Sequence, residues 1–339
     1  MGDFLSTANK KKESENGSND YIKYGSCSMQ GWRKRMEDSH ITDLSKGEEG
    51  RYQIFGVFDG HGGKEVAQFV KNHFTETFLS NSELQKDNIK EALKQTFLKM
   101  DDLMRTPEGK EELKKLNEIS EKEDKEQDEL NKKNNPEDSR NDFLRNILSL
   151  RGPKTDIAGQ TGCTACVCVI DIKHKKMYFA NAGDSRVVLC RNGIAEPMST
   201  DHKPELEEEK KRIYEAEGWI TEGRVKGNLN LTRGFGDLEY KGNVKLTPEQ
   251  QMITANPDIK VIDWDSSCDF IIVGCDGIWD CLTNQEACDR VKTGIKENPD
   301  DNISNTLEKI LDSICATDLY NETGIGCDNM TVCVALFKK

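Results

Sequence analysis

Acidic residues stand at the ends of short apolar runs in three separate parts of the sequence. Asp59 and Asp276 each follow a run rich in Val, Ile and Phe, and Asp328 comes just before another such run. Runs of this length predict buried strands, so each acid would lie at a strand end. If the acids converge, they and the Glu37-Asp38 pair would repel one another unless multivalent cations hold them together. Hard oxygen ligands suit Mg²⁺ or Mn²⁺, so we interpret the chain as a two-metal phosphoester hydrolase.

The residues after Asp59 would leave room for a metal ion and a phosphate. The glycines on both sides of His61 have no side chains, and the carbonyl oxygen of Gly60 can itself be a metal ligand. His61 would then be placed to donate a proton to a leaving alkoxide. Each feature alone has a plainer interpretation, because Asp-Gly is a common turn and a lone histidine is usually structural. Their arrangement in one chain carries the hypothesis.

The composition limits the class of partner. The chain has 339 residues, 35% of them apolar, which is enough for one large core or two small ones. The net charge of -13 argues against nucleic acid as the main partner, because binding to a phosphate backbone depends on Lys and Arg clusters. Bound divalent cations would offset the charge locally, so an anionic substrate is compatible with this composition.

The 12 cysteines do not indicate a disulfide framework. They lie in or beside apolar runs, at positions that small apolar residues could fill, and there is no secretory signal. Cys163 and Cys166 have the spacing of a redox or zinc half-motif, but no second pair and no helix start follow them. We therefore expect a reduced, cytoplasmic chain, and no apolar run reaches membrane-spanning length.

The first 20 residues are polar, which predicts a flexible arm (residues 1–20) ahead of one catalytic domain (residues 21–339). The chain begins with a pattern for myristoylation of Gly2, and the lysines at 10–12 would add a weak electrostatic anchor. The alternative is a polar arm that begins with Met-Gly by chance, since Asp3 is an unhelpful neighbour. Peripheral membrane association through a Gly2 myristate is the expectation that depends on this pattern.

The remaining pattern predicts many antiparallel-type strands with helices clustered before and after them, typical of an α+β layered fold. Asn192-Gly193 indicates a tight hairpin turn, and Thr283 with Glu286 indicates a capping box that opens a helix. The predicted strands cover residues 22–29, 39–43, 52–58, 164–170, 176–180, 187–190, 259–264 and 270–275, and the predicted helices include residues 63–80, 88–104, 204–217 and 303–314.

A charged insertion interrupts this pattern at about residues 106–158. Its acids stand four residues ahead of lysines, as at Glu111 and Lys115, which predicts an exposed helix ending at Asn134. A short helix with an apolar face would follow it. We favour a solvated excursion whose last helix docks on the body, and a partner-binding arm is the alternative. The apolar face consists of Phe143, Leu144, Ile147 and Leu148.

In its motifs the sequence strongly resembles the type 2C metal-dependent protein serine/threonine phosphatases. The matching pieces run in the family order over nearly the whole chain from Tyr24 onward, and so many together are very specific. The longest are Met36-Glu37-Asp38-Ser39-His40, Val57-Phe58-Asp59-Gly60-His61-Gly62-Gly63, Asn181-Ala182-Gly183-Asp184-Ser185-Arg186, Thr200-Asp201-His202-Lys203-Pro204, Leu231-Thr232-Arg233-Gly234-Phe235-Gly236-Asp237, Cys275-Asp276-Gly277-Ile278-Trp279-Asp280 and Cys327-Asp328-Asn329-Met330-Thr331.

The resemblance implies two Mn²⁺ or Mg²⁺ ions and a weaker third. Asp59 would bridge the first two ions. Asp276 and Asp328 would complete the shell of one ion, and the Gly60 carbonyl that of the other. The remaining implied ligands are Glu37 and Asp38, directly or through waters, and Asp184 and Asp280 at the third site.

The resemblance also implies a mechanism. The two ions would acidify a bridging water, and the resulting hydroxide would attack phosphorus in line. Arg33 would grip the phosphate with its planar fork, whereas its rival Arg35 is typical of surface charge. His61 would protonate the departing Ser or Thr oxygen. Asn329 would orient a neighbouring ligand or water, and Cys163 would serve only in packing.

The implied fold is a central β-sandwich of two mainly antiparallel sheets flanked by helices on both sides, in α-β-β-α layers. The first hypothesis is a monomeric phosphatase acting on phosphoserine and phosphothreonine proteins, because every metal-ligand position is filled. The alternative is a catalytically idle regulator or scaffold that acts through the charged insertion. A third hypothesis, a nuclease, is disfavoured by the net charge and by the lack of a basic-aromatic stripe.

Overall fold

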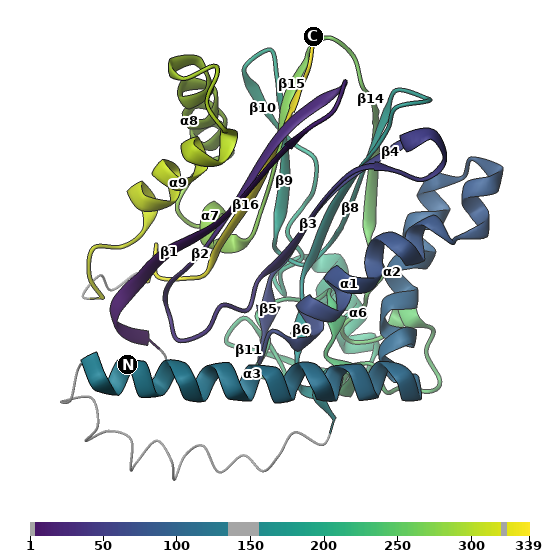
Figure 1. Cartoon of the computed structure of the whole chain (residues 1–339). Coiled ribbons are helices and arrows are strands. Elements are labelled where there is room, and N and C mark those ends of the chain that lie inside the picture. The colour runs from purple at the N-terminus through teal and green to yellow at the C-terminus, as the bar shows by residue number, and fades with distance from the viewer. Residues whose placement is uncertain (1–3, 135–155, 320–323) are drawn as a thin grey trace.

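The computed structural model describes residues 4–134, 156–319 and 324–339, and Figure 1 shows how the elements are arranged. Two antiparallel sheets pack face to face and helices cover both outer faces. The expected α+β sandwich with helical outer layers is therefore confirmed. The covering helices are α1 (Glu65–Leu79) and α2 (Ile89–Arg105) on one side, and α8 (Asn284–Glu297) and α9 (Ile303–Ile314) on the other.

The first sheet has six strands in the order β1-β2-β16-β15-β9-β10, and each neighbouring pair is antiparallel. The turn between its last two strands has Asn192 at φ 51° and Gly193 at φ 80°, as the Asn-Gly signal predicts. The strands are β1 (Phe4–Ser18), β2 (Ile22–Arg33), β16 (Met330–Phe337), β15 (Cys268–Gly274), β9 (Arg186–Arg191) and β10 (Ile194–Pro197).

The second sheet has five antiparallel strands in the order β14-β8-β7-β4-β3, and a small sheet of two-residue strands lies below it. The strands of the larger sheet are β14 (Asp258–Asp263), β8 (Lys176–Ala182), β7 (Ala165–Asp171), β4 (Tyr52–Phe58) and β3 (Ser39–Lys46). The small sheet contains β13 (Phe235–Gly236), β6 (Gly162–Cys163) and β5 (Gly60–His61), and a separate hairpin contains β11 (Ile220–Thr221) and β12 (Arg224–Val225).

Strand β4 shows how the sequence separates the layers. Phe55 and Val57 belong to the core between the sheets, where the rings of Phe55 and Tyr24 are 5.7 Å apart. Ile54 and Phe58 instead pack with the residues of α1 and α2. Because successive side chains of a strand face opposite sides, a strand covered on both faces needs apolar residues on both, which explains the apolar run from Ile54 to Phe58.

Strand β1 is where the structure departs from the flexible arm predicted for residues 1–20. Its backbone pairs with β2 along the outer edge of the sheet. The Ser14 hydroxyl donates to Glu308 of α9 at 2.6 Å. The Asn16 amide donates to Ser304 of α9 at 2.7 Å. An edge strand with exposed side chains needs no apolar face, so its polar composition resembles that of a disordered segment.

The charged insertion begins with a helix, α3, which the structure describes over Pro107–Asn134. Most side chains of its first half are exposed, as predicted, but the thin apolar stripe packs on the body, where Leu113 is buried with residues of α1 and α2. Charge pairs of Lys64 with Glu123, and of Arg35 with Asp124 at 2.8 Å, help to tie α3 to the body. The predicted apolar face at Phe143, Leu144, Ile147 and Leu148 lies outside the described residues.

None of the helices in the described part of the chain combines the length and the apolar content that crossing a bilayer requires. Gly2 lies outside the described residues. Its myristoylation, the cytoplasmic or membrane-associated location and the monomeric state therefore stay predictions.

Helix α6 (Glu207–Glu215) carries a buried acid, Glu209, which fastens the segment between β10 and β14. Glu209 is 1% exposed and accepts hydrogen bonds from Arg233 at 2.6 Å and from Arg212 at 2.7 Å. Arg233 also donates to Asp258 at the start of β14, at 2.7 Å. Although burial raises the pKa of Glu209, the two arginines outweigh it and lower the pKa to about 2.

Replacing Glu209 by Gln should destabilise the protein by about 3 kcal/mol near neutral pH, because the buried arginines lose their shared partner. Folding lowers the pKa of Glu209 from 4.5 to about 2, so its stabilising contribution is complete above pH 4.5 and is lost as the pH falls toward 2. The difference in unfolding free energy between wild type and variant, measured by urea denaturation, should therefore shrink from about pH 5 to about pH 3.

The matched control is Glu207→Gln, because Glu207 lies on the same helix with a side chain 88% exposed. It should change the free energy of unfolding by less than about 0.5 kcal/mol at either pH. A Glu209→Gln difference that is the same at both pH values would contradict the assignment of the lowered pKa to the arginine pairs.

Candidate active site

A pocket of about 640 Å³ opens at the end of the sandwich where β4 and β15 end and β16 begins. Antiparallel pairing of β15 with β16 brings the end of the first beside the start of the second. Segments far apart in the sequence therefore contribute acids to one place. The lining residues that the sequence analysis singled out are Arg33, Arg35, Glu37, Asp59, Gly60, His61, Asp184, Asp276, Asp328 and Asn329.

Asp38 lies behind this wall, next to Asp59. Ligand atoms of Asp38, Asp59 and Cys275 lie within 4.8 Å of one another. Both carboxylate oxygens of Asp38 are buried and have no hydrogen-bond partner among the described residues. A buried carboxylate without donors is costly, so its surroundings suit a positive charge that would satisfy these oxygens.

The acids of the pocket also perturb one another. Burial and then the charge of Asp276 raise the pKa of Asp59 well above its usual range. Burial and then the charges of Asp184 and Asp328 do the same to Asp276. Burial raises the pKa of Asp38 to about 7. A cation among these carboxylates would relieve the repulsion and lower their pKa values again.

Asp184 and Asp280, the predicted ligands of a third ion, lie around one ammonium group. The buried Asp184 follows β8 and accepts a hydrogen bond from Lys203. Asp280 follows α7 (Asp276–Trp279), and burial raises its pKa while the charge of Lys203 opposes the rise. Asp280 is not among the residues that line the pocket. The sequence analysis gave Lys203 no role. Its position in a motif shared with the family was the one sign in the sequence that it belongs to the site.

The two candidate arginines have different partners. Arg33 donates to Asp328 at 2.6 Å, which holds its guanidinium on the acidic cluster. Arg35 instead forms a pair with Asp124 of α3 at 2.8 Å. This difference favours Arg33 as the residue that would bind a phosphate, and it connects Arg35 with the charged insertion.

Asn329 fastens the loop that carries Glu37. Its side-chain oxygen accepts a hydrogen bond from the Glu37 backbone N–H at 2.9 Å. Its amide nitrogen donates to the carbonyl oxygens of Gln30 at 2.8 Å and Arg35 at 2.9 Å. Asn329 therefore fixes the position of the Glu37 loop, and its role in orienting a neighbouring ligand stays a prediction.

Gly277 permits the close approach of the segments that carry Asp276 and Asp328. A Cβ atom at position 277 would lie 2.0 Å from the Asn329 carbonyl oxygen. No other residue fits this space without moving the backbone, so the glycine is required where the two segments meet.

His61 contacts Asp237, an acid without a role in the sequence analysis. Its Nε2 atom lies 2.7 Å from Asp237 Oδ2. Burial lowers the pKa of His61, but the charge and hydrogen bond of Asp237 outweigh it and raise the pKa. Cys163 is fully buried, and burial raises the pKa of its thiol well above the usual range, as expected for a packing residue.

The donor set fits Mg²⁺ or Mn²⁺. Carboxylate and carbonyl oxygens are the ligands that these cations prefer, and the Asp38 oxygens lack other partners. The neighbouring Cys275 does not alter this assignment. A cysteine binds metals as the thiolate, and burial raises the pKa of the Cys275 thiol well above the usual range, so the thiol stays protonated.

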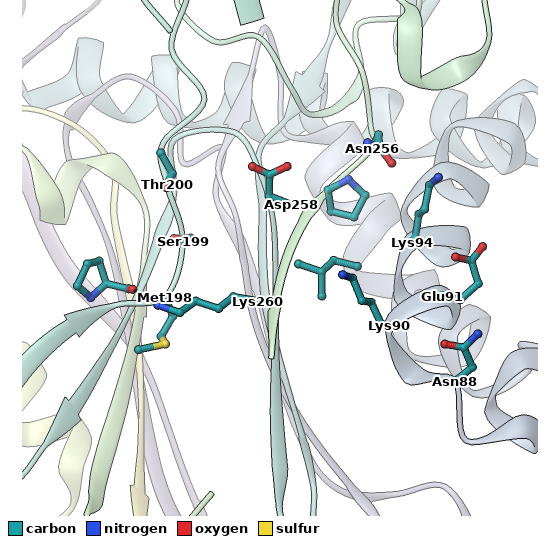
Figure 2. Close-up of a pocket in the computed structure, with 13 residues that line it drawn as sticks. Asn88, Lys90, Glu91, Lys94, Met198, Ser199, Thr200, Asn256, Asp258 and Lys260 are labelled. Carbon is teal, nitrogen blue, oxygen red and sulfur yellow. Dashed lines mark hydrogen bonds between the residues drawn. The ribbon is translucent and has the colours of Figure 1, made fainter. Parts of the chain in front are cut away.

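A second pocket, of about 690 Å³, lies between α2 and the start of β14. Figure 2 shows Asp258 between the loop after β10, which carries Thr200, and the helix that carries Lys94 and Glu91. Asp258 is already bound by Arg233, and the acids among the lining residues are limited to Glu91 and Asp258. We therefore assign the chemistry to the first pocket.

The sequence matches the family model described as "Protein phosphatase 2C" over residues 22–115 and 108–319. The chain belongs to the protein phosphatase 2C family. It is 42% identical to "Probable protein phosphatase 2C 21" of Arabidopsis thaliana, over all of this chain and 93% of the relative. It is 41% identical to "Probable protein phosphatase 2C 3" of Paramecium tetraurelia, over the full length of both. The chain is thus a protein phosphatase, and its family implies dependence on Mn²⁺ or Mg²⁺.

Solved structures share the fold. A phosphatase from Toxoplasma gondii superimposes with a TM-score of 0.68 at 20% identity, over 96% of each chain. A sex determining protein from C. elegans gives a TM-score of 0.63 at 22% identity, over 94% of this chain and 66% of that one. At these identities the likeness shows the sandwich fold of this phosphatase and no more.

Asp276→Asn should raise the stability of the phosphatase in EDTA by about 1 kcal/mol, because it removes one of the carboxylates that repel one another. Saturating Mn²⁺ should stabilise the wild type by about 3 kcal/mol at a hundredfold excess over Kd and the variant much less. Thermal unfolding at about pH 8, where more of the acids are ionised, measures both effects.

Asp263→Asn is the control, since Asp263 is exposed and paired with Lys176. This variant should respond to EDTA and Mn²⁺ as the wild type does. The assignment of a cation site to the acidic cluster fails if the wild-type melting temperature does not respond to Mn²⁺ or if Asp276→Asn responds to the same extent.

Proposed function

We propose that this phosphatase hydrolyses phosphoserine and phosphothreonine monoesters in the pocket of the acidic cluster. The observation that carries the proposal is the convergence of carboxylates from distant segments with Arg33 and His61 around that pocket. Acids alone would repel a phosphate dianion, so the substrate needs cations among them and an arginine at their edge.

The same cluster would hold the metal ions. When bound, the ions would lower the pKa of water to supply hydroxide near neutral pH and would neutralise charge on the phosphate. The unpartnered oxygens of Asp38 and the raised pKa of Asp59 support this use. Two ions would be held by Asp59, Gly60, Asp276 and Asp328 with Glu37 and Asp38, and a weaker third by Asp184 and Asp280.

The remaining side chains would handle the phosphate and the proton. Arg33, held on Asp328 through one nitrogen, has further donors in its fork for the phosphate oxygens. It would stabilise the charge that develops on them in the transition state. His61 would give a proton to the Ser or Thr oxygen as it leaves.

Release of phosphate from a phosphothreonine peptide should require Mn²⁺ or Mg²⁺ and should stop in EDTA. Asp59→Asn should lower kcat at least about 100-fold, because it removes the carboxylate at the centre of the cluster. Asp263→Asn should retain wild-type activity. Activity that persists in EDTA or in Asp59→Asn would reject the mechanism, and an inactive wild type that binds partners would favour the regulator hypothesis.

Arg33→Ala should lower kcat/KM for the same peptide about 100-fold, because a charge-assisted, two-point contact with the phosphate is lost. Arg35→Ala should lower it less than about 3-fold, since Arg35 is paired with α3. Steady-state kinetics of the two variants decide between the arginines. A larger loss in Arg35→Ala would reverse the assignment.

A further inference from the structure

A small sheet brings His61 beside Asp237, although the two residues are 176 positions apart. Its central strand, β6, pairs with β5 on one side and with β13 on the other. Gly162 in β6 pairs with His61 and also with Gly236, which directly precedes Asp237. Backbone pairing across three two-residue strands therefore sets the distance between the histidine and the acid.

The backbone of Asp237 is fixed as firmly as that of its partner. Asp237 has the left-handed conformation, with φ 48° and ψ 37°, and its N–H donates to the Thr161 carbonyl at 2.9 Å. Most side chains avoid this conformation and Asp tolerates it. The residue is 3% exposed, so its carboxylate is enclosed and directed at the ring of His61.

Because Gly162 has no side chain, the side chains of His61 and Asp237 can meet beside it. A Cβ atom at this position would lie 2.2 Å from Asp237 Oδ2 and 2.6 Å from His61 Nε2. Real Cβ atoms do not approach other atoms so closely, so any larger residue would push the two side chains apart. The sequence of β6 is thus matched to the contact between His61 and Asp237.

The contact uses one of the two ring nitrogens. A carboxylate can only accept, so Nε2 carries the hydrogen that bridges the 2.7 Å to Asp237 Oδ2. Nδ1 has no hydrogen-bond partner among the described residues, and His61 lines the pocket. We propose that Asp237 is a positioning residue, which anchors the His61 ring through Nε2 so that Nδ1 faces the leaving oxygen. The inference rests on the proposed function, in which His61 is the proton donor.

The chemical step assigned to this pair balances as follows. Water gives up one proton to solvent and its oxygen forms a bond to phosphorus, while the bond from phosphorus to the Ser or Thr oxygen breaks and leaves its electron pair on that oxygen. The proton on His61 Nδ1 moves to the same oxygen and produces a free hydroxyl group. The neutral ring keeps its Nε2–H bond to Asp237 and regains a proton from solvent. A ring without the anchor would present Nδ1 correctly for only part of the time.

The test compares two substrates on each preparation. p-Nitrophenolate leaves as a stable anion and needs little protonation, whereas the Ser or Thr alkoxide needs a proton as it leaves. Asp237→Ala should lower kcat for a phosphothreonine peptide about 100-fold and kcat for p-nitrophenyl phosphate less than about 3-fold, with KM unchanged. Asp237→Asn, which keeps an oxygen near Nε2, should recover part of the loss. The ratio of the two rates does not depend on the fraction of folded protein.

Gly162→Ala disturbs the contact between His61 and Asp237 in a second way. It should shift the ratio of kcat for the two substrates in the same direction as Asp237→Ala does. Gly242→Ala is its control, because a Cβ there would meet nothing within 4 Å, and it should leave the ratio unchanged. His61→Gln separates the two proposals. If His61→Gln shifts the ratio and neither Asp237 variant does, the positioning role is overturned while the proposed function stands. If His61→Gln leaves the ratio unchanged, the positioning role and the role of His61 as proton donor are both overturned, while the metal-dependent activity is tested separately.

Discussion

Repulsion among buried carboxylates is the constraint on which the rest of this structure depends. Asp59, Asp276 and Asp38 lie together at one end of the sandwich, and burial with neighbouring negative charge raises the pKa of each. Such a cluster reduces stability unless cations complete it, so the arrangement trades stability for function. The net charge of -13 poses the same problem for the whole chain, because an acidic protein repels an anionic substrate. A phosphate ester can bind to it only where positive charge is concentrated locally.

The surrounding fold holds the cluster against this repulsion. The strands that end at the acids are buried on both faces, so their backbone positions are fixed by packing from both sides. Asn329 and Gly277 add short-range constraints between the acid-bearing segments, and the small sheet fixes the histidine. Rigid elements thus carry the acids, and the segment between β10 and β14 lies beside them, held by the Glu209 pairs.

Local patterns in the sequence predict those parts of the molecule that burial determines. Asp59, Asp276 and Asp328 were recognisable because continuous apolar runs mark strands covered on both faces. Strand β1 was missed, since an exposed edge strand has no apolar face, and the burial of Leu113 depends on packing against α1 and α2. The contacts of Lys203 with Asp184 and of His61 with Asp237 join distant segments, so spacing alone could not pair them.

The central claim is that the acids of this pocket exist to bind divalent cations. Crystals grown or soaked with Mn²⁺ and measured at its absorption edge test it directly, because anomalous scattering locates the ions without reference to activity. The account predicts anomalous peaks in contact with Asp59, Asp276 and Asp328. Crystals that show this pocket fully accessible, with Mn²⁺ bound elsewhere and none among these carboxylates, would contradict it.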